Sequence, residues 1–298
     1  FKEGRQETVS ENSSNVTEEI RQVGGHRNRE LKALKAFKKY GWNMFKPITA
    51  MKVIGSNTFE RLFNNVRAGE DTWAVDVSEA KEFFRDKAKR YNYWSWDFKK
   101  QYSFKDGTNR DFSLSLEQIM SLYAYSKRSQ ADKHLEIGGF VFDDAIEVTE
   151  KKHGIPLKYT VNDANPYRLT KEGIAEVISA LTEEQKQFLD EMQTYLSDVM
   201  GAKGNEISLA MYDIKLYNEK NYFPLKTARH FREFNAEQSA TPNLKNSGFS
   251  KKTVPQAGNP IVLSNFMDVW SSHVNDMSMY HAFVLPLEDF MRVYNYSS

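Results

Sequence analysis

The sequence has 298 residues, with 41 Lys and Arg against 40 Asp and Glu, six His and no Cys. Its 40% hydrophobic and 13% aromatic content excludes a disordered or collagen-like chain, and its balanced charge argues against a protein that neutralises phosphates over its whole surface. The absence of cysteine excludes disulfides, thiolate zinc sites, iron–sulfur clusters and a cysteine nucleophile.

The first 40 residues combine a polar segment with a basic helical pattern. Residues 1–30 are rich in Ser, Asn, Glu and Gly and predict a polar lead-in. Because the chain begins without Met, we expect it to be a piece of a longer protein. From Arg27 to Tyr40 an apolar stripe runs beside six Lys and Arg residues and Glu30 alone, which predicts an amphipathic basic helix.

Two further helices are predicted before a dense aromatic cluster. The first begins after Pro47, runs over residues 48–66 and ends near Gly69, and the second begins at Ser78, a favourable N-cap. The cluster follows that helix and consists of Tyr93, Trp94, Trp96 and Phe98.

The middle of the chain carries the clearest local signals. Alternating apolar residues on both sides of Asp106-Gly107 predict a β-hairpin. Helix starts are predicted at the capping boxes Ser115-x-x-Gln118 and Thr182-x-x-Gln185 and at Thr170, and the helix after Thr182 is expected to end or bend near Gly201 or Gly204. Period-two alternation predicts strands over residues 140–142, 146–148 and 155–161.

The last third of the chain predicts a long loop followed by a helix. Pro and Gly punctuate residues 227–260, which show almost no periodicity. Ser264 is expected to cap a final helix that ends before Pro286. The fold class predicted is mainly α (α+β). We expect an irregular multi-helix domain over residues 31–298 with a few short antiparallel strands or hairpins, and any boundary between two lobes should fall near 130–165.

No pattern assembles a catalytic or cofactor site, so we predict no cofactor and favour a non-catalytic protein. Gly201 to Asn205 does not match a phosphate-binding loop. The carboxylates near the predicted strands, Asp143, Asp144, Glu147 and Asp163, could serve a nuclease or glycosidase, but exposed turns explain them more simply. His273 and His281 share one face of the final helix and are weak metal candidates. That face is apolar, which favours packing.

Basic residues beside aromatic ones form the main binding signal. Cationic side chains could follow a nucleic-acid backbone while aromatic rings stack on bases, although the same arrangement is common on a solvated face beside a core cluster. The candidate contacts for nucleic acid or a protein partner are Lys35, Lys39, Tyr93, Trp94, Trp96, Arg229, Arg232, Lys251 and Lys252.

Seven distinctive strings resemble a segment of the large polyvalent, multidomain proteins of Firmicutes phages and integrative mobile elements. The resemblance covers about residues 40–296. Its strings are Gly138–Phe142, Lys158–Asn165, Met200–Asn205, Asn221–Lys226, Asn246–Pro255, Asn259–Trp270 and Val274–Asp289.

The resemblance implies a setting and no catalytic residue. It implies neighbouring modules of the same long protein as partners, and the bacterial cytoplasm or a phage particle as the location. Our leading hypothesis is a non-catalytic helical interaction or scaffolding module. The alternatives are a nucleic-acid-binding or metal-dependent nuclease-like element, and a structural or DNA-delivery component of a phage particle. No apolar run in the sequence approaches the ~18 residues of a membrane span.

Overall fold

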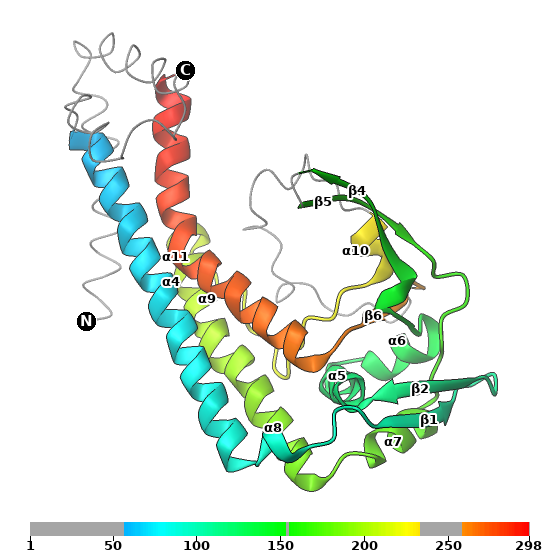
Figure 1. Ribbon diagram of the computed structural model, residues 1–298. Helices are drawn as coiled ribbons and strands as arrows, with labels where there is room; N and C mark the ends of the chain where they lie inside the picture. Colours follow the sequence, from blue (N-terminus) through cyan, green and yellow to red (C-terminus); the bar gives the residue numbers. More distant parts are fainter. Residues whose placement is uncertain (1–56, 153–154, 233–257, 298) are drawn as a thin grey trace. The chain divides into compact units, whose positions relative to one another are not determined.

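A computed structural model describes residues 57–152, 155–232 and 258–297, which are mainly helical with a few short strands (Figure 1). The predicted helix over residues 27–40 lies outside these ranges, as do Lys35, Lys39, Lys251 and Lys252. The chain divides into two compact units. Unit 1 comprises residues 1–76, 206–214 and 278–298, and unit 2 comprises residues 77–205 and 215–277, so the boundary expected near 130–165 falls inside unit 2.

The helix α4, Asn57–Arg90, replaces the two helices predicted before the aromatic cluster. The predicted end at Gly69 and start at Ser78 are therefore wrong. Within unit 1, a Cβ on Gly69 would lie 2.8 Å from the carbonyl oxygen of Ala282. The glycine thus permits a close helix contact and does not terminate the helix.

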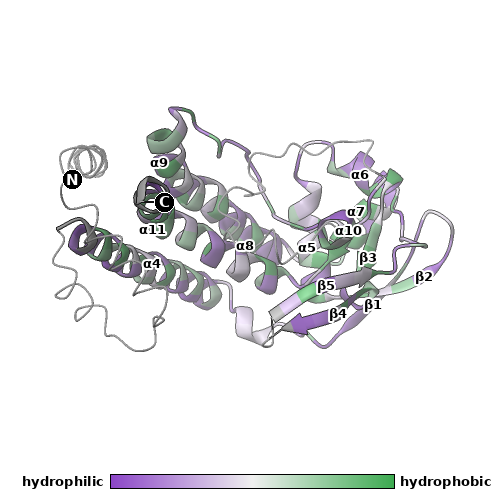
Figure 2. Ribbon diagram, turned by 90° about the horizontal axis from the view of Figure 1, so that it is seen from above, coloured by the Kyte–Doolittle hydropathy of each residue, from purple (hydrophilic) through white to green (hydrophobic). Residues whose placement is uncertain are grey.

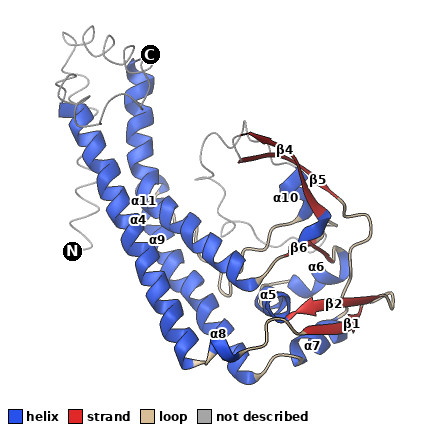
Figure 3. Ribbon diagram, in the orientation of Figure 1, coloured by secondary structure: helices blue, strands red, loops and turns tan. Residues whose placement is uncertain are grey.

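Unit 2 begins with the predicted hairpin, which is confirmed. The strands β1 (Gln101–Lys105) and β2 (Asp111–Ser115) pair antiparallel, with Tyr102 opposite Leu114 and Phe104 opposite Phe112. Ser115 and Gln118 form the predicted capping box at the start of α5 (Leu116–Ser126). This helix buries eight of its eleven residues and lies at the centre of the unit's core (Figure 3).

A parallel strand pair corrects the expectation of antiparallel strands alone. β3 (Phe140–Phe142), which follows α6 (Ala131–Ile137), pairs in parallel with β6 (Ile261–Leu263). The remaining two-stranded sheet is antiparallel, between β4 (Ile146–Lys152) and β5 (Ile155–Val161). Because more than a hundred residues separate β3 from β6, no local sequence signal joins them.

The predicted caps at Thr170 and Thr182 are confirmed at the starts of α7 (Lys171–Ser179) and α8 (Glu183–Thr194). The helical conformation does not end after α8. It continues through a π-helical turn at Tyr195–Met200 into α9, Gly201–Tyr212. Gly204 is buried against Tyr217 and Met277 in unit 2, so this glycine also provides space for packing.

Two helices correct the picture of the last third of the chain. The predicted loop 227–260 contains the short helix α10, Ala228–Arg232, and residues 233–257 lie outside the described ranges. The final helix α11, Phe266–Ser297, includes Pro286 and does not end before it. No described helix is long and apolar enough to cross a membrane. In Figure 2, hydrophobic and hydrophilic residues alternate along α4, as in an amphipathic helix.

Candidate interaction surface

The aromatic cluster predicted at 93–98 forms where α4 ends, in unit 2. Asn92 adopts a left-handed conformation with φ of 49°, and the chain then enters a single 3₁₀ turn, η1 (Tyr93–Ser95). The Tyr93 ring packs 5.3 Å from Phe188 and 4.8 Å from Phe98, measured between ring centroids. Only 5% of Tyr93 is exposed. Tyr93 therefore belongs to the packed base of the cluster, and little of its ring is accessible to a partner.

Trp94 is the exposed member of the cluster. It is 73% exposed, the largest value among the large hydrophobic residues that the structure describes. Its ring lies perpendicular to Tyr93 and Phe84, at centroid distances of 5.1 and 6.0 Å. Trp96 is half-buried and packs edge-on against Phe188 at 5.3 Å. The cluster thus presents one tryptophan to solvent on a base of packed rings.

Carboxylates near the cluster serve the first turn of α11. The Tyr93 hydroxyl donates to Glu117 at 3.2 Å, and Glu117 also accepts a bond from the backbone N–H of Met267. Burial, together with the charge of Asp268, raises the pKa of Glu117. Ser264 does not lie at the cap position, because α11 begins at Phe266 and Asn265 is the residue before it; the Ser264 hydroxyl instead donates to Asp143 at 2.7 Å. A helix N-terminus attracts negative charge, which explains why these carboxylates gather there.

The basic residues around the cluster are partly neutralised. Lys87 and Arg90 both bind Glu191, at 2.7 and 3.3 Å. Lys100 lies 4.6 Å above the Tyr102 ring. Lys89, Lys99 and Lys100 are exposed, and the ring contact leaves the charge of Lys100 intact. The ion pairs with Glu191 are therefore what reduces the positive charge available to a phosphate backbone.

The remaining predicted contact residues lie elsewhere. Arg229 is exposed on α10, and Arg232 is the last residue of that helix. No interaction among the described residues joins Arg229 to Trp94. The predicted loop contacts at 251 and 252 lie outside those residues.

The two candidate metal-binding histidines have other surroundings. His273, in unit 2, is buried, and its ring lies 5.2 Å from that of Tyr222. Burial, together with the charge of Lys226, lowers the pKa of His273 to about 3. His281, in unit 1, binds Asp76. Over the described ranges, no group of three or more His, Asp or Glu residues is arranged to hold a metal ion.

Several of the strings that carry the family resemblance contribute packing or backbone contacts. Gly139 has φ of +71°, and a Cβ there would lie 2.2 Å from the carbonyl oxygen of Tyr167. Asn205 bonds both the N–H and the carbonyl of Tyr217, each at 2.9 Å. In the string Asn221–Lys226, Tyr222 and Phe223 are almost fully buried. These contacts give those strings a structural role.

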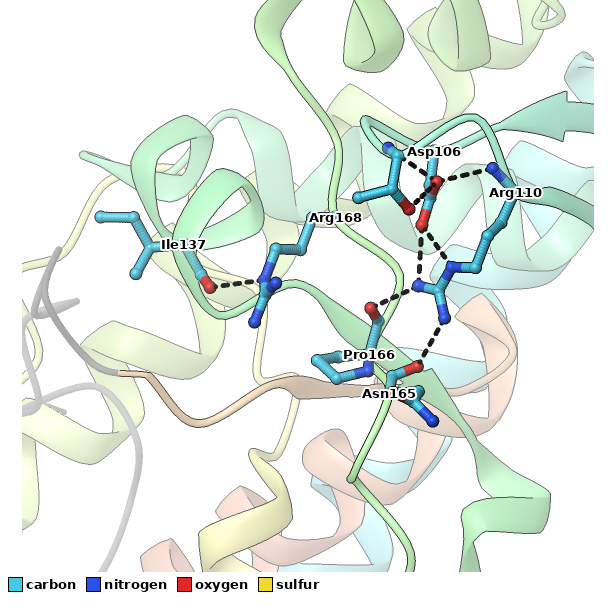
Figure 4. Close-up of polar contacts among 7 residues, drawn as sticks. Asp106, Arg110, Ile137, Asn165, Pro166 and Arg168 are labelled. Atoms are coloured by element: carbon cyan, nitrogen blue, oxygen red, sulfur yellow. Dashed lines mark hydrogen bonds and ion pairs between the residues drawn. The ribbon is translucent and has the colours of Figure 1, made fainter.

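One polar cluster was not predicted from the sequence. In the hairpin turn, Asp106 accepts bonds from the backbone of Thr108 and Arg110 and from both side chains, and Arg110 continues to the carbonyl of Pro166 at 2.6 Å (Figure 4). Nearby, Arg168 donates to the carbonyl of Ile137 at 3.0 Å. Asp-Gly signalled the turn, but no local pattern indicates that Arg110 ties it to a segment 56 residues away.

Comparisons with protein-family models, with curated proteins and with solved structures found no match.

Proposed function

We propose that this chain is a non-catalytic helical interaction or scaffolding module, and that Trp94 is its main contact residue. The observation that carries the proposal is the 73% exposure of Trp94 on a packed aromatic base. Tryptophan is among the residues that contribute most to binding free energy in protein interfaces. A side chain already held in place loses little conformational entropy on binding. The setting in a large phage or mobile-element protein rests on the sequence resemblance alone.

The apolar surface of unit 1 supports the same proposal. Eight of the twelve exposed large hydrophobic residues in the described chain belong to unit 1, which holds less than a quarter of the described residues. They are Val66, Trp73, Val75, Tyr212, Ile214, Met279, Phe290 and Met291. Such a concentration is typical of surfaces that meet other protein segments.

The test compares what the chain binds with and without the Trp94 side chain. Immobilised wild type, Trp94→Ala and the control Ile137→Ala, which truncates another exposed apolar side chain of unit 2, are exposed to host lysate, and the bound proteins are quantified. We expect at least one partner to be retained by the wild type and the control, and to bind Trp94→Ala ~30-fold more weakly, as for an interface hot spot. If Trp94→Ala retains every partner at wild-type levels, Trp94 is not the contact residue and the proposal fails.

A nucleic-acid-binding role is the second candidate, and the exposed Lys89 and Lys99, each five residues from Trp94 along the chain, favour it. A gel-shift titration with single-stranded and duplex DNA over a range of salt concentrations tests this role. A binding constant that falls steeply with salt would support it, whereas no retardation at low ionic strength would exclude it.

A further inference from the structure

In unit 1, α4 and α11 pack against each other and leave apolar side chains exposed beside their contact. The two helices run in opposite directions (Figure 1), and a Cβ on Gly69 would lie 2.8 Å from the carbonyl oxygen of Ala282. Val66 and Trp73 lie three residues before and four residues after Gly69, and each is 37% exposed. At 3.6 residues per turn, both are therefore rotated by about 40–60° from Gly69 in the same sense.

α11 exposes apolar side chains on the same side of the helix pair. Met279 and Phe290 lie three residues before and eight residues after Ala282, and they are 41% and 37% exposed. Both are rotated by about 60–80° from Ala282, again in the same sense as along α4. Because the helices are antiparallel, equal senses of rotation fall on one side of the pair. We call these four residues the α4–α11 face: Val66, Trp73, Met279 and Phe290.

The described part of unit 1 has a strong excess of negative charge. Residues 57–76, 206–214 and 278–297 contain eight Asp and Glu, three Arg and no Lys. One exposed carboxylate lies on the α4–α11 face itself, because Glu70 follows Val66 by four residues and precedes Trp73 by three. An apolar helical surface with this charge favours an occupant that is apolar on one side and basic on the other.

The chain contains such a segment close to unit 1 along the sequence. Arg27–Tyr40 carries six Lys and Arg against Glu30 alone, and its apolar residues include Leu31, Leu34 and Phe37. Sixteen residues separate Tyr40 from Asn57, where α4 begins. An extended linker of this length spans roughly 50 Å, whereas the part of α4 in unit 1 is only about 30 Å long. The segment can therefore reach every part of the α4–α11 face.

We propose that Arg27–Tyr40 binds the α4–α11 face as an amphipathic helix within the same chain. Its apolar residues cover Val66 and Trp73, and its Lys and Arg meet the carboxylates of unit 1. A second copy fits the face less well, because two units with the same excess of negative charge repel each other. This inference goes beyond the proposed function. With the face of unit 1 covered by the chain itself, Trp94 is the surface that serves an outside partner.

Limited digestion of the purified full chain with trypsin tests the apolar contact. Trypsin cleaves after Lys and Arg, and the segment offers six such sites. When docking is fast relative to cleavage, the cleavage rate follows the undocked population. Trp73→Ala should raise cleavage at these sites about tenfold, as for a tryptophan at an interface. Val75→Ala is the matched control, since Val75 is 55% exposed but lies on another side of α4, and it should change nothing.

Two further variants separate docking from a fault in folding. Phe37→Ala alters the segment and leaves unit 1 intact, so it should raise cleavage about as much as Trp73→Ala. Glu70→Lys should raise cleavage about threefold, the size expected for an exposed ion pair. Asp71→Lys is its matched control, because Asp71 is also exposed but points about 100° further around α4. Equal midpoints in urea should accompany all of these results.

The proposal is overturned if the wild type is cleaved at these sites as fast as Trp73→Ala and Phe37→Ala. It is also overturned if protection rises with protein concentration, because a second copy is then the occupant. Equal rates in Glu70→Lys and Asp71→Lys would contradict the charge pairing. Trp94→Ala should leave the cleavage rate unchanged, so the failure of this proposal and the failure of the proposed function are distinguishable.

Discussion

Replacing Asp106 by asparagine should destabilise the protein by removing the charge that organises the β1–β2 turn. The side chain of Asp106 is fully buried. Burial acts to raise its pKa, but the bonds from the backbone and side chains of Arg110 and Thr108 outweigh burial and lower the pKa to about 2. In Asp106→Asn, the amide oxygen can still accept from Thr108. The NH₂ group, however, faces the guanidinium of Arg110, which is itself a donor.

The size of the effect follows from the pKa. The ordinary value for this carboxyl is 3.8, and lowering it to about 2 corresponds to about 2 kcal/mol of preference for the ionised form in the folded state. Since the folded pKa is depressed, this stability is present above the unfolded pKa, near 4. It is lost as the pH falls towards 2. We therefore expect Asp106→Asn to lower the free energy of unfolding by about 2 kcal/mol at pH 7.

Urea unfolding at pH 7 and at about pH 2.5, followed by far-UV circular dichroism, measures both quantities. The difference between wild type and Asp106→Asn should shrink at the lower pH, because the unfolded wild-type chain then binds a proton on this carboxyl that the folded chain mostly does not. Asp111→Asn is the matched control, since Asp111 is exposed on β2 of the same hairpin. A variant within about 0.5 kcal/mol of wild type at pH 7 would refute the reasoning.

Two further predictions concern buried positions in unit 2. Gly139→Ala should destabilise the chain by several kcal/mol, because its Cβ would meet the Tyr167 carbonyl oxygen at 2.2 Å in a left-handed backbone. Gly258→Ala is the control and should not destabilise the chain, since no atom lies within 4 Å of its Cβ. Equal midpoints of urea unfolding for the two variants would contradict this prediction. His273, with its pKa lowered to about 3, stays neutral in the folded chain while the unfolded chain binds a proton below about pH 6.5. The free energy of unfolding should therefore fall as the pH drops below that value, by about 3 kcal/mol at pH 4. In His273→Gln the free energy of unfolding should fall less over the same range. A His273 ring that titrates near pH 6.5 by NMR would refute this prediction.

The local signals in the sequence predicted where several elements begin. The capping boxes at Ser115 and Thr182 and the cap at Thr170 are all confirmed, as is the hairpin around Asp106-Gly107. These features depend on hydrogen bonds between residues two to four apart, so the sequence contains all the information that they require. The mainly α (α+β) class followed from the same periodicities.

The predictions that failed depended on contacts between segments that are distant along the chain. Glycine and proline normally interrupt a helix, yet α4 continues through Gly69 and α11 contains Pro286. At Gly69 the close contact with Ala282 requires a residue without a Cβ. The sequence of α4 alone does not reveal this requirement. Likewise, β3 finds its parallel partner in β6, a run of three apolar residues too short to be recognised as a strand by itself.

The same distinction applies to the candidate sites. Composition identified the aromatic cluster, but only the tertiary structure decided that Tyr93 is buried in its base while Trp94 faces solvent. Spacing placed His273 and His281 on one helical face, but the partner of His281 is Asp76, 205 residues away. The sequence by itself therefore determined the residue types and the local caps. The tertiary structure decided exposure, charge pairing and partners, because these properties arise from contacts between segments that are distant along the chain.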